Sequence, residues 1–382
     1  MEAIDLFIER PALVVPLLLL LSFVVQMIYY LGVYTSILTY KGKATKPQPI
    51  SPPPVSVIIC AKDEEANLEK NLPAVLNQDY PDYEVIVVNH GSSDDTDMVL
   101  KRLQQQHEHL KTTEIKRDQK FAHGKKLALT VGIKKAAHEW LLFTDADCYP
   151  TSKNWIRSMA RNFDEKTSVV LGYGGYEARR GFLNSLIRFD TLTIALQYFA
   201  YALRGFPYMG VGRNLAYRKS LYFQNKGFAG HYHIESGDDD LFVNQTAGKA
   251  NTRVQISRDS VVLSEPHHTF INWFKQKSRH LTTAPFYKGK TRLRLLTEVI
   301  SRLVFYVAFV LALVLFPRYY TYILGVFIIR LIAQLLDYKG IMNRVGEKKL
   351  LFVVLFYDIL IPFINFMGII KNKIASNNHQ WK

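Results

Sequence analysis

The sequence contains little cysteine and comparatively little negative charge. Two cysteines among 382 residues exclude a secreted fold held together by disulfides. Its 33 acidic residues are outnumbered by 48 basic ones, and the formal net charge of +15 favours an anionic partner, such as nucleic acid, a membrane surface or a phosphorylated substrate. Internal repeats and low-complexity tracts are absent, and a hydrophobic content of 48% excludes a disordered chain.

Long uncharged runs gather at the two ends of the chain. Residues 12–40 carry no charge, and about 20 apolar residues suffice for a helix to cross a bilayer. The run is too long for a signal-peptide core and no cleavage site is evident, so we expect a retained transmembrane anchor over residues 1–40. Two or three transmembrane helices are expected within 299–370, from apolar runs at 299–316, 320–336 and 350–370. The last run contains Asp358 and Pro362 and could instead be re-entrant or interfacial.

Basic residues next to these runs predict their orientation, because cytosolic loops are enriched in lysine and arginine. The clusters follow the first run and lie between the last two runs: Lys41, Lys43, Lys46, Lys339, Arg344, Lys348 and Lys349. This pattern places residues 41–298 and 337–349 in the cytosol, in a multi-pass integral membrane protein with a cytosolic catalytic domain. If the last run crosses the bilayer, the polar, basic tail at 371–382 lies on the side opposite the cytosol, where the distribution of positive charge disfavours it. The tail fits the rule if the last run does not cross the bilayer.

The charged middle of the chain predicts an α/β domain over residues 55–265, preceded by a linker at 41–54. Short apolar runs indicate strands buried on both faces, at 55–61, 83–88 and 140–144. Helices are expected between them, at 65–77, from 94–95 to about 107, and at 125–137. Alternating strands and helices favour a mainly parallel sheet, whose ligands bind at the carboxyl ends of the strands.

Polar side chains follow these apolar runs, at the predicted strand ends. Asp145-Ala146-Asp147 comes directly after a buried strand, and two carboxylates one residue apart resist each other's ionisation unless a cation lies between them. Oxygen-only ligands at this spacing suit Mg²⁺ or Mn²⁺ held together with substrate phosphates. A single acid such as Asp94 is more simply explained as the N-cap of a helix.

A phosphate-bearing ligand also requires cations and an acid–base group. The sequence at 123–126 opens a helix, where free backbone N–H groups favour an anion. A solvated helix start is the simpler explanation for one of its two lysines, Lys125 and Lys126. Three adjacent aspartates, from Asp238 to Asp240, repel one another. A surface N-cap explains one of them, and one could act as general base.

A basic amphipathic, interfacial segment is predicted at 266–298. Seven basic residues and no acidic one lie between 275 and 294, interleaved with Trp273, Phe274, Leu281 and Phe286, which favours contact with anionic lipid headgroups. Nucleic acid is a poorer explanation because no groove-reading motif is present. No cysteine accompanies the nearby histidines at zinc-ligand spacing, and we expect Cys60 and Cys148 to be free buried thiols.

Together these motifs resemble a membrane-bound, inverting family 2 glycosyltransferase of the GT-A fold, over residues 54–280 and loosely over the flanking runs. The resemblance is carried by Val55 to Glu65, Gln78 to Pro81, Glu84 to Val88, Gly91 to Thr96, Lys125 ahead of Ala128-Leu129, Asp145 to Asp147, Gly210 to Ala216 and Asp238 to Leu241. It implies a nucleotide-sugar donor, a lipid, lipid-linked or glycan acceptor, and a lipid bilayer as partners, with no nucleic acid.

The same resemblance implies roles for individual residues. Asp145 and Asp147 would hold the divalent metal, Mg²⁺ or Mn²⁺, and the nucleotide diphosphate. The register of the second acidic cluster makes Asp238 the catalytic base, with Asp239 as the second candidate. Donor-binding residues would also include Lys62, Glu64, Asn89, His90, Lys125 and Arg279, and acceptor-side residues would be Arg213, Asn214 and Gln276.

Three departures from the family pattern bear on the activity. Asn89-His90 stands where two aspartates are common, Gly237 stands where a glutamate precedes the base, and His280 stands where processive synthases carry a tryptophan. The last departure favours a single-sugar transferase, with a processive membrane polysaccharide synthase as the alternative. A catalytically inactive nucleotide-sugar sensor that regulates a membrane assembly is the alternative from another class.

Overall fold

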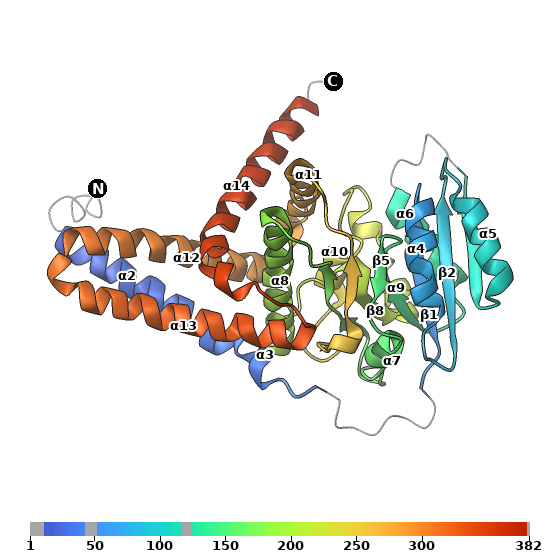
Figure 1. Ribbon diagram of the computed structural model, residues 1–382, viewed down its shortest axis with the longest axis horizontal. Helices are drawn as coiled ribbons and strands as arrows, with labels where there is room; N and C mark the ends of the chain where they lie inside the picture. The colour runs from blue at the N-terminus through green and yellow to red at the C-terminus, as the bar shows by residue number, and fades with distance from the viewer. Residues whose placement is uncertain (1–10, 43–51, 117–123, 380–382) are drawn as a thin grey trace.

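The computed structural model describes residues 11–42, 52–116 and 124–379. An α/β domain occupies one side of the molecule, and long apolar helices project from the other (Figure 1). Two of the lysines that bear on the predicted orientation, Lys43 and Lys46, lie outside the described residues, as does His123.

A seven-stranded sheet forms the centre of the α/β domain, in the order β3-β2-β1-β4-β8-β6-β9. Its strands are β1 (Val55–Ala61), β2 (Tyr83–His90), β3 (Leu110–Ile115), β4 (Trp140–Phe143), β6 (Val169–Leu171), β8 (Leu215–Arg218) and β9 (Thr252–Val254). Neighbouring strands pair in parallel, except that β8 runs antiparallel to both β4 and β6. The predicted mainly parallel α/β fold is therefore confirmed.

The sequence analysis predicted β1, β2 and β4 and missed the other strands of this sheet, among them β3. The sequence of β3, LKTTEI, is mostly polar, and only Leu110 is fully buried. This strand pairs with β2 at the edge of the sheet, where one side has no neighbouring strand. An edge strand that keeps contact with water does not require a continuous apolar run, so the apolar pattern could not reveal it.

Helices cover both faces of the sheet. Three pack on one face, α4 (Glu65–Leu76), α5 (Thr96–Gln106) and α7 (Trp155–Ala160). Three lie on the other face, α6 (Gly124–Lys135), α8 (Phe182–Leu203) and α10 (Asp240–Thr246). The helices predicted at 65–77, about 94–107 and 125–137 correspond to α4, α5 and α6.

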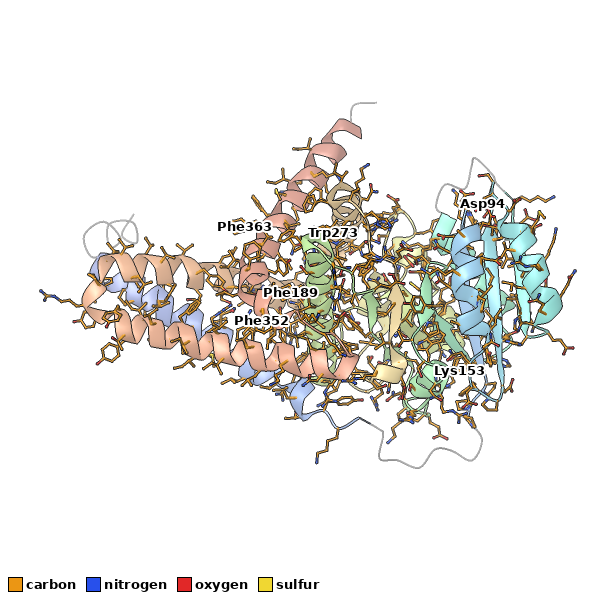
Figure 2. All side chains as sticks on the ribbon, in the orientation of Figure 1. Asp94, Lys153, Phe189, Trp273, Phe352 and Phe363 are labelled. Atoms are coloured by element: carbon orange, nitrogen blue, oxygen red, sulfur yellow. The ribbon has the colours of Figure 1, made fainter. Side chains whose placement is uncertain are left out.

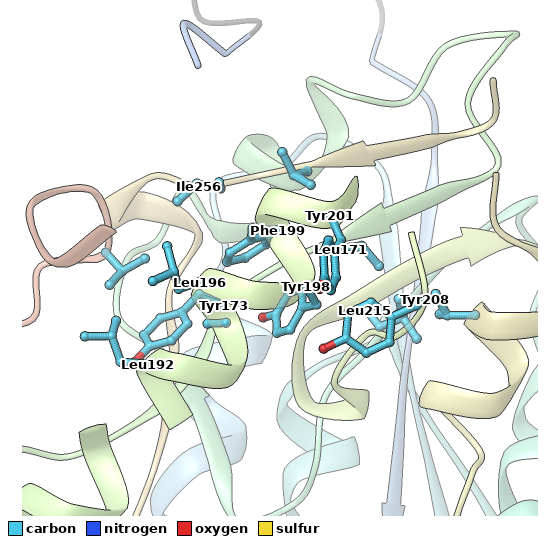
Figure 3. Packing of buried hydrophobic residues seen from close by; sticks show 14 of the residues in the cluster. Leu171, Tyr173, Leu192, Leu196, Tyr198, Phe199, Tyr201, Tyr208, Leu215 and Ile256 are labelled. Carbon is cyan, nitrogen blue, oxygen red and sulfur yellow. The ribbon is translucent and has the colours of Figure 1, made fainter. Parts of the chain in front are cut away.

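The long helix α8 joins the sheet to the apolar helices. Figure 3 shows Leu196, Tyr198 and Phe199 of this helix packed with Leu171 of β6 and Leu215 of β8. The Tyr198 hydroxyl also donates a hydrogen bond of 2.7 Å to a backbone carbonyl beside β6. The same buried cluster continues into the apolar helices, so the two parts of the molecule share one hydrophobic core.

A smaller sheet and two short connecting elements complete the domain. The sheet contains β5 (Cys148–Pro150), β10 (Val262–Ser264) and β7 (Gly174–Tyr176), in that order. The short helix α9 (Lys219–Gln224) follows β8, and α11 (Phe270–Leu281) follows β10. The predicted interfacial segment at 266–298 thus contains α11 and also the beginning of the next long helix.

Within the described residues, four helical segments are long and apolar enough to cross a membrane: Leu13–Thr39, Gly289–Leu315, Pro317–Val345 and Leu351–Ile374. The first contains α2 (Pro11–Met27), a π-helical stretch (Ile28–Tyr34) and α3 (Ser36–Thr39); the others contain α12 (Gly289–Leu315), α13 (Tyr320–Val345) and most of α14 (Val354–His379). Because α12 begins at Gly289, Lys290, Arg292 and Arg294 belong to the same helix as the apolar run that follows them.

Candidate active site

A narrow pocket lies at the carboxyl ends of β1 and β4, where the fold class predicts a ligand site. It is lined by Cys60, Lys125, Leu129, Phe143, Thr144, Asp145, Gly212, Leu215, Tyr217, Asp238 and Asp239. These residues come from two strand ends, the start of α6, the segment around β8 and the loop before α10. The fold therefore brings both predicted acidic clusters to one place.

Lys125, in the first turn of α6, joins two carboxylates in this pocket. Its Nζ atom donates a hydrogen bond of 2.9 Å to Oδ1 of Asp145 and lies 3.4 Å from Oδ2 of Asp238. Burial would lower the pKa of Lys125, but these two carboxylates hold it well above its ordinary value. Solvent still reaches 44% of the Lys125 side chain and 34% of that of Asp145, so a ligand can reach the pair.

Asp145 and Asp147 offer oxygen ligands for a divalent cation. The potential ligand atoms of Asp145, Asp147 and Cys148 all lie within 4.8 Å of one another. Burial and the charge of Asp145 raise the pKa of Asp147, because adjacent carboxylates resist ionising together. Burial of Asp145 opposes ionisation too, but Lys125 holds the pKa of its carboxyl below the usual range.

The chemistry of this group fits a hard cation. Burial raises the pKa of the Cys148 thiol well above its ordinary value, and the thiol donates to Oδ1 of Asp147 over 3.2 Å. A protonated thiol is not a ligand for Mg²⁺ or Mn²⁺, whereas two carboxylates are suitable ligands alongside phosphate and water. Asp145 and Asp147 are therefore the residues of this group that fit the predicted metal.

The three adjacent aspartates differ in their hydrogen bonds. Asp239 accepts one from the backbone N–H of Gly212 and one from that of Asp240, both over 2.7 Å, and it is the N-cap of α10. Asp240 is buried and accepts hydrogen bonds from the hydroxyls of Thr283, over 2.5 Å, and Tyr287, over 2.6 Å. Both of these carboxylates thus hold parts of the fold together.

Asp238 and Asp239 both line the pocket, and Asp238 is the one whose carboxylate contacts Lys125. The Asp238 side chain is 10% exposed. Burial, followed by the charges of Asp238 and Asp240, raises the pKa of Asp239 to about 7. Asp238 is therefore the carboxylate of this cluster next to Lys125, while Asp239 carries the strongly shifted pKa.

The neighbouring lysines of α6 have different surroundings. Lys126 is 2% exposed, and its Nζ atom donates to the backbone carbonyls of His231, over 2.5 Å, and Ile234, over 2.7 Å. It therefore fixes the loop that leads to the three aspartates. Lys125 is the lysine that reaches the pocket, as the sequence resemblance implied.

The predicted acceptor-side residues meet at Tyr176 of β7, with one exception. The Arg213 guanidinium lies 4.4 Å from the centre of the Tyr176 ring, and the Tyr176 hydroxyl donates to Gln276 over 3.1 Å. Asn214, in contrast, is fully buried; it donates to the carbonyls of Tyr173 and Ser260 and accepts from Trp155. Because its side chain is enclosed by the scaffold, the expected acceptor contact of Asn214 is not available in this structure.

Residues just after β1 and at the end of β2 form the rim of the site and do not line the pocket itself. Asn89 accepts a hydrogen bond of 2.7 Å from the Ser92 hydroxyl, and Lys62 is exposed. Burial, and then the charge of Lys62, lower the pKa of His90. Burial raises the pKa of Glu64, and the charges of Asp147 and Asp145 raise it further, which places Glu64 in the field of the metal motif.

Helix α11 places His280 in the electrostatic field of Lys125, Arg213 and Asp145. Arg279 is exposed on this helix. Although solvent also reaches His280, the surrounding protein atoms and the positive charges of Arg279, Arg213 and Lys125 lower its pKa to about 4. His280 is therefore neutral near pH 7 and does not add to the positive charge of the site.

Residues 56–223 match the sequence model described as Glycosyl transferase family 2. Residues 56–223 therefore form a family 2 glycosyltransferase domain. In structure the chain resembles a mannosyltransferase from Pyrobaculum calidifontis, solved with GDP-Man and Mn²⁺, with a TM-score of 0.53 over 89% of this chain and 99% of that one. At 19% identity this likeness supports the GT-A fold of the glycosyltransferase domain.

Curated relatives match shorter stretches of sequence. A dolichyl N-acetyl-alpha-D-glucosaminyl phosphate 3-beta-D-2,3-diacetamido-2,3-dideoxy-beta-D-glucuronosyltransferase from Methanococcus voltae is 30% identical over 186 residues, covering 47% of this chain and 52% of the relative. A poly-beta-1,6-N-acetyl-D-glucosamine synthase from Staphylococcus epidermidis is 31% identical over 93 residues, covering 24% and 21%. The chain thus spans about half, or less, of the length of these relatives.

Two of the departures from the family pattern have a structural counterpart in the glycosyltransferase domain. Gly237 has a φ of 97°, and a Cβ atom there would meet Leu241 at 2.5 Å, so a glutamate does not fit this backbone. The ring of His90 packs against Gly124, where a Cβ atom would meet it at 2.7 Å. The surrounding residues therefore pack around Gly237 and His90 as they stand in this chain.

Sequence reasoning missed the contacts that support the site from a distance. Thr283 and Tyr287, which hold Asp240, lie between α11 and α12 in the predicted interfacial segment. Lys277 of α11 is buried and pairs with Asp190 of α8 over 2.7 Å. No motif marks these residues, because each acts through a contact between segments that are far apart in the sequence.

Proposed function

We propose that this chain is an inverting, metal-dependent glycosyltransferase that moves a sugar from a nucleotide-sugar donor to a lipid, lipid-linked or glycan acceptor. The observation that carries the proposal is the position of Lys125 between Asp145 of the metal motif and Asp238 of the second acidic cluster. Lys125 thus lies between a motif that could bind a cation and a carboxylate, that of Asp238, that could accept a proton.

Asp145 and Asp147 would hold Mg²⁺ or Mn²⁺ together with the donor diphosphate. When bound, such an ion neutralises negative charge on the leaving group. Lys125, which lines the pocket, and Arg279, which is exposed on α11, would add positive charge on the donor side, where diphosphate charge develops as the bond from the sugar to the diphosphate breaks. Lys62, Glu64, Asn89 and His90 form the nearby rim on which the nucleotide would rest.

Asp238 would act as general base. The acceptor hydroxyl attacks the anomeric carbon while Asp238 accepts its proton, the new glycosidic bond forms, and the bond to the diphosphate breaks. The electron pair of that bond leaves with the nucleoside diphosphate. A single in-line displacement inverts the configuration at the anomeric carbon.

The acceptor would enter between the pocket and the apolar helices, past Arg213, Tyr176 and Gln276. The curated relative from Methanococcus voltae is named for a dolichyl-phosphate-linked sugar acceptor, which supports a lipid-linked acceptor here. The Staphylococcus epidermidis relative is named as a polysaccharide synthase, so processive synthesis is the second candidate. Product length separates the two candidates, because a single-sugar transferase adds one residue per acceptor.

The test uses the full-length protein purified in detergent, a panel of UDP- and GDP-sugars, and extracted membrane lipids as acceptors. We expect turnover of one donor with Mn²⁺ and loss of turnover with EDTA. Binding of Mn²⁺ measured by EPR with nucleoside diphosphate should be lost in Asp147→Asn and kept in Asp97→Asn, an exposed acid of α5 that pairs with Lys101. Wild-type activity of Asp147→Asn in EDTA would contradict the metal role, and donor binding without turnover of any donor would favour the sensor.

A further inference from the structure

We propose that α14 lies in the membrane face next to the α/β domain and does not cross the bilayer. The chain would then cross three times, through the first apolar segment, α12 and α13, and the end of α14 would lie on the same side as the glycosyltransferase domain. This inference rests on membrane insertion of the other three helices and is independent of glycosyl transfer.

The contacts of α14 separate it from the other apolar helices. In Figure 1, α2, α12 and α13 run side by side away from the domain, whereas α14 lies across their direction and ends near α11. Helix α12 packs extensively on α2, while α14 packs mainly on α11 and α8. The neighbours of α14 therefore belong largely to the domain and its interfacial segment.

Both ends of α14 are attached to the same domain. In its first turn, Tyr357 donates to the carbonyl of Phe182, over 3.2 Å, and pairs with the hydroxyl of Ser185 at the start of α8. Near its other end, Asn372 donates to the carbonyl of Ser278 of α11 over 2.6 Å. A helix that crossed the bilayer would have one end on the far side, where these contacts could not both form.

The beginning of α14 is fixed to the bundle by charge. Asp358 pairs with Arg302 of α12 over 2.9 Å and with Arg330 of α13 over 3.0 Å. Glu298, which also pairs with Arg302, makes this buried cluster neutral. The two arginines thus explain why an acidic residue, Asp358, lies near the beginning of an apolar helix. Neither a transport channel nor a membrane crossing by α14 is needed to account for it.

One face of α14 and the short turn before it is apolar and exposed. Exposed fractions are 94% for Phe352, 56% for Phe356, 40% for Ile359, 55% for Phe363, 62% for Phe366, 41% for Ile370 and 60% for Ile374. Steps of three and four residues put these side chains on one side of a helix. Figure 2 shows Phe363 on the side of α14 away from Trp273 of α11.

The occupant of this face is the hydrocarbon and headgroup region of a bilayer. The face continues the exposed apolar surface of the membrane helices, and α11 adds Phe270 and Ile271, which are 42% and 65% exposed. Lys371 and Lys373 follow at the end of α14, where anionic headgroups would attract them. A three-span topology also places this basic tail on the domain side, as the distribution of positive charge favours.

Topology is tested with single cysteines added to the full-length protein in sealed vesicles of known orientation. Lys373→Cys reports the end of α14, and two matched exposed controls are Lys153→Cys in the domain and Arg318→Cys in the turn between α12 and α13. The unsubstituted protein is the blank for Cys60 and Cys148. We expect a membrane-impermeant maleimide to label Lys373→Cys together with Lys153→Cys and opposite to Arg318→Cys. Labelling together with Arg318→Cys would overturn the proposal.

Depth is tested by nitroxide EPR in liposomes of phosphatidylcholine and phosphatidylglycerol. Labels at Phe356, Phe363 and Ile370 should all be accessible to oxygen. Their depth in the bilayer should stay shallow along the whole of α14. Labels along α12 should instead be deepest in the middle of that helix. A central depth maximum along α14 would mean that it crosses. Protection of Phe363 from oxygen would mean that protein covers the face, and either result contradicts the proposal.

Discussion

The Nζ atom of Lys125 lies 3.4 Å from Oδ2 of Asp238, so the cation of α6 and the proposed base are in direct electrostatic contact. The same ammonium group donates to Asp145. A donor diphosphate would compete with both carboxylates for this cation, so in the proposed mechanism Lys125 would couple donor binding to the release of Asp238 as base.

Lys125 and Lys126 should respond differently to the same substitution. Lys125→Met removes a charge from the pocket, so we expect turnover to fall by about 10²–10³-fold with little change in thermal stability. Lys126→Met leaves the carbonyls of His231 and Ile234 without their donor, so we expect it to destabilise the fold by about 1–3 kcal/mol. Thermal unfolding and donor turnover of both variants check the contrast. Equal losses of stability would show that Lys125 is also a structural lysine.

Gly237 should not accept the residue that is common in the family. Gly237→Glu forces a side chain onto a backbone with a φ of 97° and against Leu241, which should cost about 1–3 kcal/mol and lower activity. The matched control is Gly289→Ala at the start of α12, where a Cβ atom meets nothing within 4 Å. Thermal unfolding in detergent compares the two. Higher activity and unchanged stability of Gly237→Glu would contradict this account of the loop.

The raised pKa of Asp239 predicts a pH dependence of stability. Its folded pKa of about 7 lies above the ordinary value of 3.8, so between these values the folded state binds more protons than the unfolded state. The contribution of this residue to stability therefore falls as pH rises from about 4 to about 7. Melting temperatures of the protein and of Asp239→Asn, measured across this window, should converge at its acidic end and differ in slope. If the two melting temperatures changed with pH in parallel, the raised pKa of Asp239 would be contradicted.

The sequence predicted those parts of the fold that have a strong local signal. The strands at 55–61, 83–88 and 140–144 are continuous apolar runs because both faces of the sheet are covered, and the motif at 145–147 follows one of them directly. The polar edge strand β3 has no such run. The choice of Lys125 over Lys126 came from the family resemblance, because both are lysines at the start of the same helix.

Long-range contacts were beyond the reach of the sequence. Nothing local marks Tyr287 as a hydrogen-bond donor to Asp240, or Asn214 as a fully enclosed residue. Helix α14 has the length and composition of a membrane span. Asp358 and Pro362 left its crossing open in the sequence, and its contacts with α8 and α11 support the proposal that it does not cross. In each case the decisive information is which distant segment lies alongside the residue.

The most direct test of the proposed mechanism is the turnover of Asp238→Asn, measured together with donor affinity. The amide cannot accept the acceptor proton, so transfer should fall by about 10²–10⁴-fold. Donor affinity should not fall, because Asp145, Asp147, Lys125 and Arg279 are intact and Lys125 loses a competing carboxylate. Asp239→Asn is the matched control. It should retain more activity than Asp238→Asn, because Asp239 caps α10 and an asparagine can also serve as an N-cap. Wild-type turnover of Asp238→Asn alongside an inactive but folded Asp239→Asn would contradict the assignment of the base.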